Sequence, residues 1–271
     1  MSDNTIAKTG MTGWSDLTVG QLVARHPQTA RVFEIHGIDY CCGGKRTLES
    51  ACAREGADVD AVRAELAEAL SGGSADQEVD WDNVSMTSLV DHIESGHHRY
   101  IRDERPRLTA LAQKVARVHG SRHPELIELA SAVERIFEDL EPHLEKEEKV
   151  FFPAFRAWEK SPAGGAPDPE LVSGLEAVEA EHTAMGEILV SIRKLTSGFE
   201  PPQDACNSYL ALFHGLEGFE ADLHEHIHKE NNILHARITD SGPQSKKTGT
   251  VIVSAKKDES GPKPDSCCHI G

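Results

Sequence analysis

Residues 126–154 read LIELASAVERIFEDLEPHLEKEEKVFFPA, and this stretch decides the fold. Apolar residues recur along it at steps of three and four, the spacing of a helix face that packs against other helices. His143 and Glu147 stand in this apolar row one turn apart, so their side chains point the same way. A buried carboxylate without a partner is costly, which requires a compensating group. A metal ion bound by both side chains would compensate it.

The same arrangement returns near the C-terminus. His226 and Glu230 stand four apart within the apolar row of residues 209–233. A third apolar row, over residues 171–192, holds a single histidine at its middle, His182. Each of these histidines alone would more often be an ordinary core or surface residue. Two identical H-x-x-x-E units in register with apolar rows, and a lone histidine between them, favour a shared metal site.

The remaining histidines of the long helical segments are less clear. The first segment offers His92, His97 and His98. The apolar spacing favours His97, but several apolar residues can also share a face with His98, so periodicity does not decide between them. His224 and His228 are also one turn apart, but their face continues through charged and polar residues. We expect both of them to face solvent.

The composition bounds the class of protein. A chain of 271 residues suggests one to two domains, and apolar residues at helical spacing favour an all-α protein. The formal charge of −17 argues against nucleic acid and anionic membranes as partners. The start MSDNTIAKTG lacks the apolar core of a signal peptide, and no run reaches the length of a membrane span. These features favour a cytoplasmic protein, and its six cysteines are typical of reduced thiols rather than structural disulfides.

Helix start and stop signals divide the chain into four parts. The parts are a small helical domain over 13–71, a linker over 72–83, a bundle over 84–238 and a disordered tail over 239–271. The small domain is expected to form helices over 18–25, 28–36, 48–55 and 59–70. Helices are expected in the second domain over 85–118, 124–159, 168–196 and 203–237. Long helices joined by short loops predict an antiparallel four-helix bundle.

A loop in the small domain carries two adjacent cysteines, Cys41 and Cys42, followed by two glycines, Lys45 and Arg46. Small residues that fit a tight turn would explain an isolated cysteine pair. Here the cations and the following helix start favour the thiolate, because both lower the pKa of a cysteine. We therefore interpret Cys41 and Cys42 as accessible, reactive thiols, and Cys52, inside the next helix, as a buried inert one.

The donor set is too large for one ion. One histidine from the first bundle helix, His182 and the two H-x-x-x-E units give four imidazoles and two carboxylates. If each carboxylate bridges, two ions have about four donors each, which leaves positions open in octahedral coordination. Mixed imidazole and carboxylate ligands suit iron, with manganese or zinc as alternatives. The competing explanation is a buried hydrogen-bond network of histidine and glutamate, which is costly and seldom duplicated.

Over about residues 15–238 the chain resembles the bacterial iron-sulfur cluster repair di-iron proteins of the ScdA and YtfE type. The motifs that carry the resemblance are HGIDYCCGGKRTL (36–48), DHIESGHHRYIRDERPRL (91–108), HLEKEEKVFFP (143–153), EAEHTAMG (179–186) and HIHKENNIL (226–234). The resemblance implies a hemerythrin-like bundle with an oxo-bridged pair of non-haem iron ions, and a small domain that presents the cysteine pair. The ligands it implies are His98, His143, Glu147, His182, His226 and Glu230.

The chain departs from the family pattern in two places. His235 and Ala236 stand where the family usually has Phe-Pro, and we expect His235 to be exposed. The tail ends in Cys267, Cys268 and His269, which could capture metal or exchange disulfides, although a dispensable extension explains it as well.

The resemblance implies repair of iron-sulfur clusters damaged by nitrosative or oxidative stress. The iron pair would supply iron or react with nitric oxide, and Cys41 and Cys42 would contact the damaged client protein. The expected partners are therefore damaged iron-sulfur proteins and the gases NO and O₂, with a homodimer possible. Two other functions remain open: a hemerythrin-like sensor or carrier of O₂ or NO, and an enzyme that reduces NO.

Overall fold

The computed structural model describes residues 17–71, 81, 84–161 and 167–240. Within these ranges the regular structure is helical, and the one pairing of extended backbone is an isolated antiparallel bridge between Thr18 and Thr47. The all-α prediction is therefore confirmed. None of the helices in these ranges combines the length and the apolar character needed to cross a membrane. The expectations for residues 1–12, for most of the linker and for the tail beyond residue 240 fall outside the described residues.

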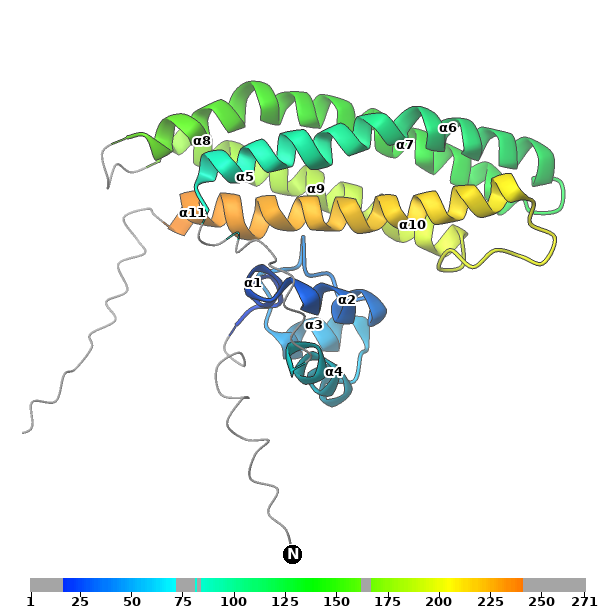
Figure 1. Ribbon diagram of the computed structural model, residues 1–271, viewed down its shortest axis with the longest axis horizontal. Helices are drawn as coiled ribbons and strands as arrows, with labels where there is room; N and C mark the ends of the chain where they lie inside the picture. The colour runs from blue at the N-terminus through cyan, green and yellow to red at the C-terminus, as the bar shows by residue number, and fades with distance from the viewer. Residues whose placement is uncertain (1–16, 72–80, 82–83, 162–166, 241–271) are drawn as a thin grey trace, which may run out of the picture.

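The small domain contains four short α-helices (Figure 1), and its buried apolar residues form one continuous hydrophobic cluster with residues of the bundle. Its elements are α1 (Val19–Arg25), the 3₁₀ turn η1 (Pro27–Thr29), α2 (Ala30–Ile35), α3 (Leu48–Glu55) and α4 (Val59–Ser71). Thr18 caps α1 through a reciprocal hydrogen-bond pair with Gln21. Thr47 caps α3, which ends at Gly56 in the left-handed conformation, at φ 71°. Cys52 is buried in this core, as the sequence predicted.

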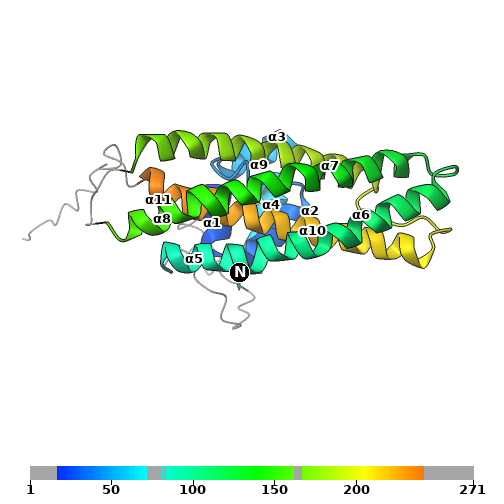
Figure 2. The same cartoon turned by 90° about the horizontal axis from the view of Figure 1, so that it is seen from above.

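Four long antiparallel helical arms form the second domain, and Figures 1 and 2 show them side by side. The first arm is α5 (Met86–His92), η2 (Ile93–His98) and α6 (Arg99–His119), and the second is α7 (Glu125–Lys146), η3 (Glu147–Phe151) and α8 (Phe152–Glu159). The third arm is α9 (Pro169–Leu195), and the fourth is α10 (Asn207–His228), η4 (Lys229–Leu234) and α11 (His235–Asp240). The fourth helix begins four residues later than expected, because the chain after Pro202 makes a turn and Cys206 is extended.

Three of the four arms contain a π-helical segment at the same level of the bundle. These segments are η2, η3 and η4, and each carries or begins at a candidate metal ligand: His98, Glu147 and Glu230 respectively. A π turn holds an extra residue, so it changes the direction in which the following side chains point, and such turns are frequent at functional sites. The helical periodicity of the sequence did not reveal them.

The small domain lies against the fourth arm of the bundle (Figure 1). Asn232 Nδ2 donates to the carbonyl oxygens of Cys41 (2.9 Å) and Tyr40 (3.2 Å), and Lys45 forms an ion pair with Glu179 at 2.8 Å. The Gly44 backbone lies close to the Asn232 side chain, because a Cβ atom added at Gly44 would lie 2.7 Å from Asn232 Cγ and 2.6 Å from the Tyr40 carbonyl oxygen. The cysteine loop is thereby held on the bundle.

This contact corrects the expectation that His224 and His228 face solvent. The Tyr40 ring lies edge-on to both imidazoles, at centroid distances of 6.3 and 5.5 Å, and His228 is only 3% exposed. Burial lowers the pKa of both histidines to about 4. As predicted, α10 has a polar face, but the small domain packs on this face, which is therefore not exposed to solvent.

Candidate metal centre

The six side chains predicted as ligands meet in the middle of the bundle. His98 comes from η2, His143 from α7, Glu147 from η3, His182 from α9, His226 from α10 and Glu230 from η4. All six are at most 2% exposed. They form two groups whose ligand atoms lie within 4.8 Å of one another, and both groups include Glu147 and Glu230.

The first group joins His98 and His226 through the two carboxylates. The Nε2 atoms of these histidines lie 3.2 Å apart. Glu147 Oε2 lies 3.5 Å from His98 Nε2, and Glu230 Oε1 lies 3.0 Å from His226 Nε2. Four donor atoms therefore surround one point.

The second group joins His143 and His182, whose Nε2 atoms are 2.9 Å apart. Here Glu147 contributes its other oxygen, Oε1, at 3.4 Å from His143 Nε2. Glu230 likewise turns Oε2 to this group, at 3.2 Å from His182 Nε2. Each carboxylate thus divides its two oxygens between the groups, which is the arrangement of two bridging ligands.

Both oxygens of Glu147 and Oε2 of Glu230 have no hydrogen-bond partner among the described residues. Glu147 is 1% exposed, so these oxygens are also hidden from water. A completed network of histidine and glutamate hydrogen bonds, the alternative to a metal site, would satisfy them. Unpaired carboxylate oxygens that face imidazole nitrogens are better explained by bound cations.

Hydrogen bonds behind the imidazoles orient three of the four rings. The Nδ1 atoms of His98, His143 and His182 lie 2.8 Å from oxygens of Glu148, Glu181 and Asn231 respectively. A proton on each Nδ1 donates to that oxygen and leaves the Nε2 lone pair facing the carboxylates, as metal-bound histidines require. The Nδ1 of His226 has no such partner, and its ring instead stacks on His97 at 5.5 Å.

The supporting carboxylates stay charged. Burial opposes the charge of Glu148, but hydrogen bonds from Arg102 and His98 hold the pKa of its carboxyl below the ordinary value. The pKa of Glu181 is lowered in the same way, against burial, by His143 and Lys146. The apolar rows of the sequence did not indicate these residues. They could have been found from their place in the sequence, since Glu148, Glu181 and Asn231 are each the immediate neighbour of a predicted ligand.

Comparison with known proteins gives the family. A hemerythrin HHE cation binding domain matches residues 89–238, and the ScdA N-terminal domain, a domain of unknown function (DUF542), matches residues 15–70. The chain is 38% identical over 220 residues to the iron-sulfur cluster repair protein YtfE of Yersinia pseudotuberculosis serotype IB (strain PB1/+), across 81% of this chain and 95% of the relative. The chain belongs to the YtfE family. The protein of the same name from Yersinia pestis (strain Pestoides F) is 37% identical over the same shares.

His97 lies outside the two ligand groups of this YtfE family member. Its Nδ1 lies 2.9 Å from Asp222 Oδ1 and its Nε2 lies 2.9 Å from the Lys229 ammonium. Both ring nitrogens are therefore engaged elsewhere, whereas His98 Nε2 faces Glu147. The geometry places His98 in the centre, in agreement with the spacing of the family motif.

The cysteine pair differs from the expectation of accessible thiols with a lowered pKa. Cys41 is only 5% exposed, and its Sγ donates to Asp39 Oδ1 at 3.3 Å. A hydrogen bond with Cys42, burial and the Asp39 charge hold the pKa of the Cys41 thiol well above its ordinary value. The expected cation, Lys45, turns away to Glu179. Cys42 is partly exposed, with its Sγ 3.5 Å from the backbone oxygen of His182.

His235 is also not exposed, contrary to the expectation. It is 2% exposed, and its ring lies parallel to that of His182 at 6.3 Å and near Phe155 at 6.0 Å. It therefore takes a packing place behind the second ligand group. Its Nδ1 lies 3.9 Å from Glu179 Oε1, so the buried imidazole has a carboxylate beside it.

Asn231 links the metal centre to the cysteine loop, because its Oδ1 accepts from His182 Nδ1 and its Nδ2 reaches the Cys41 carbonyl at 3.5 Å. We expect Asn231→Ala to weaken metal binding about 10- to 100-fold, since the ring of His182 loses its orienting acceptor. Competition with a chelator measures this affinity. Asn232→Ala is the matched control, because Asn232 contacts the same loop but no candidate ligand, and equal losses in both variants would contradict the role of Asn231.

Proposed function

We propose that this chain binds two iron ions between His98, His226, His143 and His182, with Glu147 and Glu230 as bridges. The observation that carries the proposal is the division of each buried carboxylate between two imidazole pairs, with oxygens that no described residue satisfies. Mixed imidazole and carboxylate donors favour iron over calcium or magnesium. The cation binding domain matched by residues 89–238 supports metal binding in general.

The function that this centre supports best is the repair of damaged iron-sulfur clusters, the activity named for the YtfE relatives. An iron pair held by few protein donors would supply releasable iron and open positions for NO or O₂. The protein's own residues would hold the imidazoles in one tautomer, through Glu148, Glu181 and Asn231, and exclude water from the centre. Damaged iron-sulfur proteins in the cytoplasm would be the partners, and Cys42 would meet them.

The placement of the cysteine loop favours repair over the two other functions. A sensor or an NO reductase needs only the bundle, whereas here Cys42 Sγ lies against the backbone of His182 on the outside of the centre. Thiols beside a ligand-bearing helix suit the handling of iron or of a client cluster. The open coordination positions would also suit reversible binding of O₂ or NO, which remains the second candidate.

The test begins with protein purified without added metal. About two irons per chain are expected, with an absorption spectrum that changes when NO is added. A client enzyme whose [4Fe–4S] cluster has been damaged by NO should then regain activity when the iron-loaded protein is added. Failure of the protein to take up iron after anaerobic reconstitution would contradict the proposed iron site. A change with NO but no recovery of the client would favour the sensor.

A further inference from the structure

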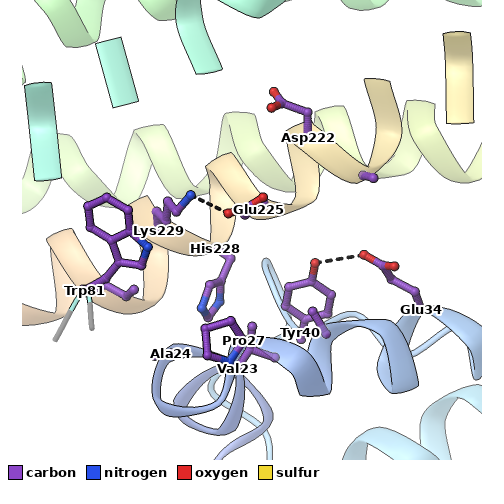
Figure 3. Close-up of a pocket in the computed structure, with 13 residues that line it drawn as sticks. Val23, Ala24, Pro27, Glu34, Tyr40, Trp81, Asp222, Glu225, His228 and Lys229 are labelled. Atoms are coloured by element: carbon purple, nitrogen blue, oxygen red, sulfur yellow. Dashed lines mark hydrogen bonds and ion pairs between the residues drawn. The ribbon is translucent and has the colours of Figure 1, made fainter. Parts of the chain in front are cut away.

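A cleft of about 360 Å³ lies between the small domain and the bundle, apart from the metal centre (Figure 3). One wall is formed by α10 and η4, and the other by α1, η1 and α2 with Tyr40. The volume falls in the range of sites for small molecules, which begins at about 300 Å³. None of the six candidate metal ligands lines this cleft, and neither does Cys41 or Cys42.

The lining of the cleft is rich in hydrogen-bond acceptors. Among the described residues that line it, the charged side chains are Glu34, Asp222, Glu225 and Lys229. The ammonium of Lys229 is already engaged, because it lies 2.5 Å from Glu225, 2.9 Å from His97 Nε2 and 3.1 Å from His92 Nε2. An ammonium has three protons to donate, so none remains for a ligand. Glu225 is paired with this ammonium, and Glu34 accepts from the Tyr40 hydroxyl at 3.2 Å. The lining still holds three carboxyl groups against one ammonium that is already engaged, which disfavours an anionic ligand.

Two polar atoms of the lining have no hydrogen-bond partner among the residues that the structure describes. His228 is 3% exposed, and Figure 3 shows its ring projecting from α10 into the cleft. Its Nδ1 lies 3.2 Å from Asn232 Nδ2, but its Nε2 has no hydrogen-bond partner. Asp222 Oδ1 bonds to His97, whereas its Oδ2 is buried and unpaired. Buried polar atoms without a partner are costly, so a ligand that donates N–H groups would relieve both.

The rest of the lining suits the hydrocarbon part of a cation. The aromatic rings of Trp81 and Tyr40 stand on either side of His228 in Figure 3, with Val23, Ala24 and Pro27 beside it. Aromatic faces attract ammonium groups, and the apolar side chains can cover methylene groups. A bare metal ion fits less well, because the described groups of side chains close enough to share one do not include the carboxylates of this cleft.

We propose that this cleft binds a small organic dication of the α,ω-diamine class. One ammonium group lies between Asp222 and Glu225, the other lies between His228 Nε2 and Glu34, and the spacer lies over the apolar side chains. Because Glu34 belongs to the small domain and Glu225 to the bundle, the ligand connects the two domains. It would therefore fasten the small domain, with its cysteine loop, to the bundle without contacting the two cysteines or the candidate metal ligands.

Calorimetric titration of the full, metal-loaded chain with putrescine tests the proposal. We expect saturable binding of one diamine per chain. Glu225→Gln and Glu34→Gln, on opposite walls, should each weaken it about tenfold by removing one charged acceptor. Glu217→Gln is the matched control, since Glu217 is an exposed carboxylate of the same helix outside the cleft. Circular dichroism and iron content verify that each variant is folded and loaded.

Non-specific attraction of cations to a chain of net charge −17 is the rival explanation. It predicts one of three results: the binding does not saturate, Glu217→Gln weakens it as much as Glu225→Gln does, or n-butylamine and Mg²⁺ bind as tightly as putrescine. Any of these results, or no binding at all, overturns the diamine site. Iron content and cluster repair are measured separately, so failure here leaves the proposed function standing.

Discussion

Replacing Glu230 with alanine is expected to empty the metal centre of both ions. Its two oxygens lie 3.0 Å from His226 Nε2 and 3.2 Å from His182 Nε2, so one substitution removes a donor from each group. Iron should fall from about two ions per chain to well below one, and the melting temperature should fall with it because metal binding stabilises the folded state. Elemental analysis and thermal melts of the same samples measure both effects.

The effect of Glu230→Ala on the melting temperature should change sign when the two proteins are compared without metal. Without metal, Glu230 is a buried carboxylate with an unsatisfied oxygen, which destabilises the fold. After chelation, Glu230→Ala is therefore expected to melt at or above the temperature of the unsubstituted chain. This change of sign distinguishes a metal ligand from an ordinary core residue, because replacing an ordinary core residue would lower the melting temperature both with and without metal.

Glu220→Ala is the matched control for this experiment. Glu220 is another buried carboxylate of the fourth arm, in α10, but it pairs with Arg193 away from the centre. Its loss should cost about 1–3 kcal/mol of stability, from the hydrogen bonds it accepts, and leave the iron content unchanged. Full iron loading of Glu230→Ala would contradict the bridging role.

Five of the six candidate ligands could be identified from the sequence because they sit in apolar rows that periodicity can detect. His98 was the exception, and η2 explains why. The π turn over Ile93–His98 holds an extra residue, so the spacing before it and the spacing after it do not share one phase. Counting in steps of three and four across this turn favoured His97. Only the family motif pointed to His98.

Burial of the other polar groups could not be predicted from periodicity. A helical pattern identifies a polar face but does not say what covers it. The face of α10 that carries His228 is covered by Tyr40, which stands 188 positions earlier in the chain. Similarly, Cys41 appeared reactive from its neighbours Lys45 and Arg46, but its thiol turns inward to Asp39. The contact of His228 with Tyr40 depends on how the small domain docks on the bundle, which local sequence does not encode. The contact of Cys41 with Asp39 lies within one loop, and it depends on the fold of that loop rather than on the nearby cations.

Cys42→Ser is expected to abolish cluster repair while leaving iron content and the response to NO unchanged. Cys42 is the partly exposed thiol of the pair and lies 3.5 Å from the His182 backbone oxygen, but it is outside both ligand groups. The initial rate of recovery of a damaged [4Fe–4S] enzyme should fall at least about tenfold, as expected when the attacking thiolate is lost. Cys41→Ser should cost less, because the raised pKa of Cys41 keeps that thiol protonated.

Cys206→Ser is the control for this variant, since Cys206 is an exposed free thiol at the start of α10, far from the loop. It should repair the client at the unsubstituted rate. If Cys42→Ser also lost iron, the thiol would belong to the metal site, and the separation between a storing bundle and a contacting loop would fail. If it repaired at the full rate, iron would reach the client without the loop, and the small domain would serve to cover the polar face of α10.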